Sequence, residues 1–188
     1  NINLRGKLCL SKSKNVYNQS LVADQIVLKG QTNATNWVKN MVANVNQPFF
    51  GGDTSLIRAV GQGKCAVGVV NHYYLARMQA GASGKNDQQL TKSIKLIMPN
   101  PAHVNISAAG MAKSAKNKKE AIALITYLTS SKGSSSIAGP TYEYPLNGFG
   151  TSSQLEAFGR FNPDNVSISK LGESQKLAIQ IMANNGWR

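Results

Sequence analysis

Residues 65–74 read Cys-Ala-Val-Gly-Val-Val-Asn-His-Tyr-Tyr, an unbroken apolar run followed directly by polar and aromatic residues. Continuous apolar character is typical of a strand that is buried on both faces of a parallel sheet. Residues 6–10 form a second short apolar run, and a polar loop and helical spacing follow it. The alternation of strand, loop and helix predicts an α/β fold.

Outward from this stretch, apolar residues at helical spacing predict helices before and after it. One begins near Val16, and a turn at residues 30–33 separates it from a second that covers Trp37 to Val45. Asp53 and Thr54 offer a cap for a short helix over residues 56–60. In the second half we predict strands at 94–98 and 104–106, helices at 119–128 and 175–183, and turn-rich surface loops at 81–84 and 130–139.

Length and charge restrict the class of protein. The 188 residues can form one core or two small lobes, and no apolar run is long enough to span a membrane. Residues 1–14 are too polar for a signal peptide, so we expect a soluble, processed chain that is peripheral to a membrane at most. The net charge of +13 is spread along the chain with few interleaved aromatics. We therefore expect no nucleic-acid partner beyond weak nonspecific attraction.

Two cysteines, Cys9 and Cys65, both fall within predicted strands. Neighbouring strands lie about 4.8 Å apart, which suits the Cα separation of a disulfide. A bridge would place the protein in an oxidising compartment such as the periplasm. Two buried free thiols are an equally good reading of the sequence.

Tyrosines follow both predicted strands of the first half. Tyr17 lies at the start of the first helix, and Tyr73 and Tyr74 directly follow the strand that ends at Val70. Ligands of open parallel sheets bind beyond the carboxyl ends of strands, so three phenols could converge on one cleft. Fe(III) is a hard cation that accepts tyrosine ligands. Simple packing of the tyrosine pair is the competing explanation.

Other reactive residues are sparse. His72 is a candidate fourth ligand, a hydrogen-bond donor behind the ligands or a solvated loop residue. His103 has no acidic or cysteine neighbour at metal-ligand spacing, so we predict a structural role for it. The acidic residues are scattered, and neither a nucleophile elbow nor a zinc-protease motif occurs. We therefore expect a binding protein and not an enzyme.

Several stretches of the chain resemble the periplasmic ferric-iron-binding proteins of cyanobacteria and other bacteria. The resemblance runs nearly end to end. Its main segments are Gly6 to Cys9, Asn15 to Val22, Asp53 to Val60, Asn71 to Arg77, His103 to Ser107, Glu143 to Pro145 and Gly186 to Trp187. It implies a type II periplasmic-binding-protein fold with one nearly complete lobe and part of the second. Residues 1–102 would form the main part of the C-terminal lobe, 103–150 a segment of the N-terminal lobe and 151–188 the return.

The resemblance also implies a function. Tyr17, Tyr73 and Tyr74 would hold Fe(III), with binding of Fe(II) left open, and His72, Asn15 and Ser13 would lie behind these ligands. The protein would be a periplasmic monomer that delivers iron to the membrane permease of an ABC transporter. The chain resembles roughly the last three-fifths of a family member, so the remaining ligands would lie outside the matched part. The alternative is a type II binding protein for an organic or oxyanion solute.

Overall fold

The computed structural model describes residues 2–45, 48–146 and 151–188, and its centre is a small parallel sheet. A 3-10 helix, η1 (Ile2–Leu4), precedes β1 (Leu8–Cys9), which pairs with β2 (Val67–Gly68) in the register Leu8 to Val67. On the other side of β1, single parallel bridges join Leu8 to Val45 and Ser11 to Phe50. The predicted parallel pairing of the two strands is confirmed.

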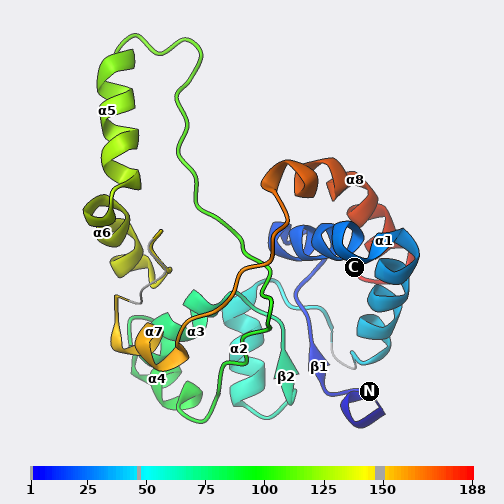
Figure 1. The fold of residues 1–188 in the computed structure, drawn as a ribbon. Coiled ribbons are helices and arrows are strands. Elements are labelled where there is room, and N and C mark those ends of the chain that lie inside the picture. The colour runs from blue at the N-terminus through cyan, green and yellow to red at the C-terminus, as the bar shows by residue number, and fades with distance from the viewer. Residues whose placement is uncertain (1, 46–47, 147–150) are drawn as a thin grey trace.

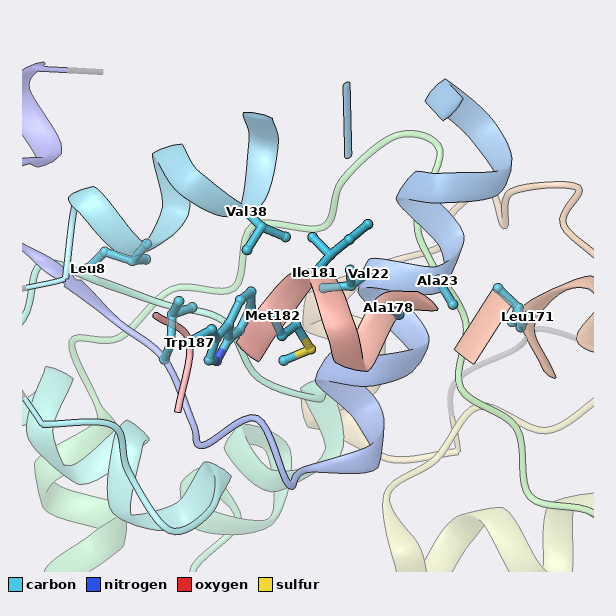
Figure 2. Packing of buried hydrophobic residues seen from close by; sticks show 10 residues of the cluster. Leu8, Val22, Ala23, Val38, Leu171, Ala178, Ile181, Met182 and Trp187 are labelled. Atoms are coloured by element: carbon cyan, nitrogen blue, oxygen red, sulfur yellow. The ribbon is translucent and has the colours of Figure 1, made fainter. Parts of the chain in front are cut away.

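One face of this sheet is covered by α1 (Val16–Ala43) and α8 (Ile168–Asn184), which lie side by side (Figure 1). Helix α1 has a kink at Gly30, whose φ of 79° is unfavourable for residues with a side chain, so the predicted turn between two helices is present. Figure 2 shows how side chains from α1, α8, β1 and the C-terminal segment fill the space between these elements. The buried cluster consists of Leu8, Leu10, Val22, Ala23, Val38, Leu171, Ala178, Ile181, Met182 and Trp187.

The opposite face is covered by α2 (Asp53–Gly61). Leu8 and Leu10 belong to the cluster with α1 and α8, whereas Cys9 packs with Leu56 and Ala59 of α2. Alternate residues of β1 therefore enter opposite layers, as expected for a strand buried on both faces. Helices α3 (His72–Gln79) and α4 (Lys85–Thr91) pack against α2, and α7 (Ser153–Phe158) packs against α3. The sequence did not predict these three helices.

A disulfide joins Cys9 and Cys65 across the parallel pair, with a Cα separation of 5.9 Å. The alternative of two free thiols is thus resolved in favour of the bridge. In the chain-entropy model a closed loop of this length stabilises the fold by roughly 4 kcal/mol. The bridge also fixes the two loops that follow the strands relative to each other.

Helices α5 (Lys118–Thr129) and α6 (Ser131–Thr141) pack on each other and stand away from the other helices (Figure 1). They belong to the range 103–150 that we expect to be a segment of a second lobe, and those lobe boundaries stay a prediction. Helix α5 has no buried residue, and Ile122 and Leu124 keep 54% and 57% of their surface exposed. No helix among the described residues is long and apolar enough to cross a membrane.

Three predictions for the second half of the chain are wrong. Residues 94–98 alternate between partly buried and exposed side chains, but no described segment pairs with them, so they are extended without being a strand. Residues 104–106 are likewise irregular. The turn-rich stretch 130–139 is mostly helix α6, because Ser130 caps it by accepting a hydrogen bond from the amide of Gly133.

Candidate metal centre

Tyr17 is held in place by the cap of α1. The Asn15 side chain accepts a hydrogen bond of 2.9 Å from the amide of Tyr17, so the helix begins at Val16 and its first turn faces the loop after β2. The backbone carbonyl of Ser13 accepts from the Gln19 amide group at 2.9 Å, which closes the same loop. Asn15 therefore contacts Tyr17 through the backbone amide, whereas the hydrogen bond of Ser13 is to the side chain of Gln19.

Tyr73 and Tyr74 lie in the first turn of α3, directly after β2. The Tyr73 hydroxyl donates to the Tyr17 hydroxyl at 3.1 Å, so two phenols from different helices meet at one point. The rings of Tyr73 and Tyr74 pack with centroids 4.4 Å apart and an interplanar angle of 31°. The parallel pairing of β1 and β2 explains this geometry, because both helices start at the same edge of the sheet.

The electrostatic environment keeps Tyr73 protonated in the absence of a strong cation. Burial is the main cause that raises the pKa of Tyr73 well above its usual range, and hydrogen bonds with Tyr17 and Tyr74 add to it. The guanidinium carbon of Arg77 lies 5.8 Å from the ring centroid of Tyr73 and 5.7 Å from that of Tyr74. This positive charge would stabilise phenolates once a metal had displaced their protons.

Asp53 connects the two loops that carry the tyrosines. One carboxylate oxygen accepts from the Asn15 side chain at 3.3 Å, and the other accepts from the Asn71 backbone amide and side chain, both at 2.9 Å. Asn15 precedes α1 and Asn71 precedes α3, so this one buried carboxylate sets the spacing of both helix starts. The sequence predicted Asp53 only as a cap of the short helix, which is wrong because Gly52 is the N-cap residue and α2 begins at Asp53. The contact to Asn71 spans 18 residues, so the sequence pattern did not indicate it.

His72 lies beside the tyrosines and is packed between aromatic rings. Its ring stands edge-on to Tyr73 at 5.9 Å and tilted against Tyr144 at 4.9 Å. Burial lowers the pKa of His72 to about 4, although an interaction with the backbone of Tyr142 partly opposes this. The hydroxyl of Tyr144 donates a hydrogen bond to the Gly159 carbonyl at 2.5 Å. Burial raises the pKa of this phenol as well.

The arrangement suits a trivalent metal on chemical grounds. Two oxygens that each lie about 2 Å from one ion, at roughly a right angle or slightly more, are about 3 Å apart. The hydroxyls of Tyr17 and Tyr73 are separated by 3.1 Å. Tyrosine oxygens are hard, anionic ligands once deprotonated, which favours Fe(III) over softer or weaker cations.

Comparison with known proteins points to one group. A profile described as bacterial extracellular solute-binding protein matches residues 3–162. Iron uptake protein A2 of Synechocystis sp. is 34% identical, and the match covers 98% of this chain and 55% of that protein. The major ferric iron-binding protein of Neisseria meningitidis serogroup B is 28% identical, over 80% of this chain and 45% of its own length. The chain thus spans about half the length of these relatives.

Solved structures agree over the whole chain. The structure of Trichodesmium IdiA (FutA) with iron and citrate ligands is 36% identical and superposes with a TM-score of 0.94, covering 100% of this chain and 61% of that one. Apo FutA2 from Synechocystis is 34% identical with a TM-score of 0.92, covering 99% of this chain and 61% of its own. The described residues therefore share the fold of the matching part of these proteins.

Proposed function

The chain belongs to the bacterial extracellular solute-binding protein family and has the type II periplasmic-binding-protein fold; from this premise we propose that it binds ferric iron through the phenolates of Tyr17, Tyr73 and Tyr74. The observation that carries the proposal is the 3.1 Å contact between the hydroxyls of Tyr17 and Tyr73, which come from different helices. Two relatives are named as iron-uptake or ferric-iron-binding proteins, and a third was solved with iron and citrate.

Charge and proton balance support Fe(III) as the cargo. Three phenolates neutralise the three positive charges of Fe(III), and the Arg77 cation near the rings of Tyr73 and Tyr74 makes formation of these phenolates less costly. Deprotonating a tyrosine at pH 7 costs about 4 kcal/mol even without burial. Only a strong Lewis acid binds phenolates tightly enough to offset this free energy of deprotonation for several tyrosines at once. Mg²⁺ and Ca²⁺ bind more weakly and are therefore poor competitors of Fe(III) for this site. Ferric binding releases the phenol protons and becomes tighter as the pH rises.

In this proposal, iron binding takes place outside the cytoplasmic membrane. The Cys9–Cys65 disulfide fits an oxidising compartment such as the periplasm. As a solute-binding protein, the chain would act as a monomer and deliver its iron to the permease of an ABC transporter. It would not catalyse a reaction. A synergistic anion such as citrate is a natural candidate to fill coordination positions that the three tyrosines leave open, since citrate accompanies iron in the Trichodesmium structure.

A titration with ferric citrate tests the ligand set. Iron bound by phenolates should give a visible charge-transfer band in the purified protein, and combining Tyr73→Phe with Tyr74→Phe should abolish both the band and tight binding. Tyr127→Phe is the matched control, because Tyr127 lies on α5 with 46% of its surface exposed. Unchanged colour and affinity in the double variant would rule out phenolate ligation.

A further inference from the structure

A second cluster of ligand-type side chains lies away from the tyrosines. Asp24 comes from the middle of α1, His103 from the segment after α4, and Asp164 from the segment before α8. One ligand atom from each of these residues lies within 4.8 Å of the others. Tyr17 and Asp24 are seven residues apart on α1, about 10 Å along the helix axis. The cluster is therefore separate from the proposed iron site.

The three side chains are buried and aim unpaired atoms at one another. Nδ1 of His103 lies 3.7 Å from Oδ1 of Asp24 and 3.7 Å from Oδ2 of Asp164, and all three side chains keep 8% or less of their surface exposed. None of these three atoms has a hydrogen-bond partner in the part of the chain that the structure describes. Unpaired buried polar atoms are destabilising, so three that face one point require an explanation.

The remaining polar atoms of the cluster are already engaged. Nε2 of His103 lies 2.9 Å from the hydroxyl of Ser20, which can accept a hydrogen bond from Nε2–H in the tautomer that has a lone pair on Nδ1. The second oxygen of Asp24 accepts from the side chain of Gln25 at 3.2 Å, and that of Asp164 accepts from the amide of Val166 at 3.0 Å. Metal-binding histidines and carboxylates are typically held in this way, by an outer hydrogen bond on the atom that does not face the ion.

The separations are longer than those of a hydrogen-bonded ion pair and closer to those of ligands around a metal ion. A protonated imidazole would donate to a carboxylate at about 2.7–2.9 Å, whereas both separations here are 3.7 Å. Two ligands about 2.1 Å from one ion are about 3.0 to 3.6 Å apart at coordination angles between a right angle and a trigonal one, slightly less than the 3.7 Å separations here, so the side chains would move slightly inward to bind an ion. A divalent cation would also balance the charge of two ionised carboxylates.

We propose that Asp24, His103 and Asp164 form a second metal site, which takes a divalent transition ion of the Zn²⁺ type. One imidazole nitrogen and two carboxylate oxygens form a ligand set that zinc accepts, and the nitrogen ligand disfavours Ca²⁺ and Mg²⁺. The ion would tie α1 to the two segments that meet at the bridge between Ala102 and Pro163. Its role would be structural, and it would not depend on iron at the tyrosines.

Titration with Zn²⁺ alone tests this site in a variant that lacks all three candidate iron ligands, Tyr17→Phe with Tyr73→Phe and Tyr74→Phe. Calorimetry on the chelator-treated protein should show one Zn²⁺ per chain and a rise in melting temperature with Zn²⁺ concentration. Adding Asp164→Asn should weaken binding more than about tenfold, and Ser20→Ala should weaken it about 10- to 100-fold. Glu173→Gln, which removes an exposed carboxylate on α8, should leave the affinity unchanged.

A second readout keeps the test informative if a variant folds poorly. Co²⁺ bound at this site should give visible ligand-field bands that disappear on addition of Zn²⁺. In a chain that keeps its tyrosines, Asp24→Asn should abolish these bands and leave the ferric charge-transfer colour intact. Absence of stoichiometric Zn²⁺ binding, or equal Zn²⁺ affinity in the Asp164→Asn and Glu173→Gln proteins, would overturn the proposal whatever the outcome for iron.

Discussion

At the scale of single residues, burial decides what His72 contributes. With a pKa lowered to about 4, its ring is neutral at pH 7, so it adds no positive charge beside a site proposed for Fe(III). Its Nε2 is buried and has no hydrogen-bond partner among the described residues. Its ring packs against those of Tyr73 and Tyr144.

The lowered pKa of His72 predicts how stability depends on pH. The unfolded chain takes up a proton near pH 6.5 and the folded chain only near pH 4, so the free energy of unfolding should fall as the pH falls through this window. The full effect is about 3 kcal/mol. Denaturant unfolding at pH 7 and pH 4 should show this loss, and His72→Asn should reduce it. Parallel pH profiles for the two proteins would contradict the prediction.

At the scale of elements, the site depends on the relative placement of α1, α2 and α3. Asp53 begins α2 and bonds the residues that precede the other two helices, Asn15 and Asn71. The disulfide fixes the strands, and Asp53 fixes the helix starts beyond them. Tyr17 and Tyr73 come together because these two constraints act on the same edge of the sheet.

Replacing Asp53 by Asn should separate the tyrosines. The amide cannot accept all the hydrogen bonds of the carboxylate, so we expect a stability loss of about 1–3 kcal/mol. Ferric affinity should fall at least about tenfold, because a ligand lost from its position weakens the site. Asp87→Asn is a suitable control: it breaks the 2.8 Å ion pair with Arg58 between α2 and α4, and should cost stability but not iron affinity. Equal iron affinities for the two variants would refute a positioning role for Asp53.

At the scale of the whole molecule, the chain consists of a packed body and a projecting helix pair. The body contains the sheet, its covering helices and the three buried clusters. The pair α5 and α6 leaves Ile122, Leu124, Tyr127 and Ile137 exposed. We infer that this pair belongs to the second lobe that the relatives possess, since the chain covers 61% of the two cyanobacterial structures.

This division predicts unequal local stability within the 188-residue chain. Amides of α5 should exchange with solvent at least about tenfold faster than those of α8, because α5 buries no residue whereas α8 contributes Leu171, Ala178, Ile181 and Met182 to the core. Hydrogen exchange followed by mass spectrometry measures both helices in one experiment. Similar protection of the two helices would show that α5 is stabilised by something other than burial.

The sequence by itself determined the features that depend on neighbouring residues. The apolar runs predicted two paired parallel strands, although the predicted full burial of the second is wrong, because both residues of β2 are only partly buried. Gly30 predicted the break in α1, and the positions of Tyr17, Tyr73 and Tyr74 after the two strands predicted that all three lie at one edge of the sheet. The same local logic failed at residues 94–98, because a strand requires a partner that its own pattern does not specify.

Only the tertiary structure decided the contacts between residues far apart in the chain. It resolved the Cys9–Cys65 alternative, made Asp53 a link between two loops, and placed Asp24 and Asp164 beside His103, which the sequence showed without an acidic neighbour. The physical reason is that burial and charge pairing act through space. The spacing of residues along the chain predicts which side chains meet only when one helix or strand carries all of them.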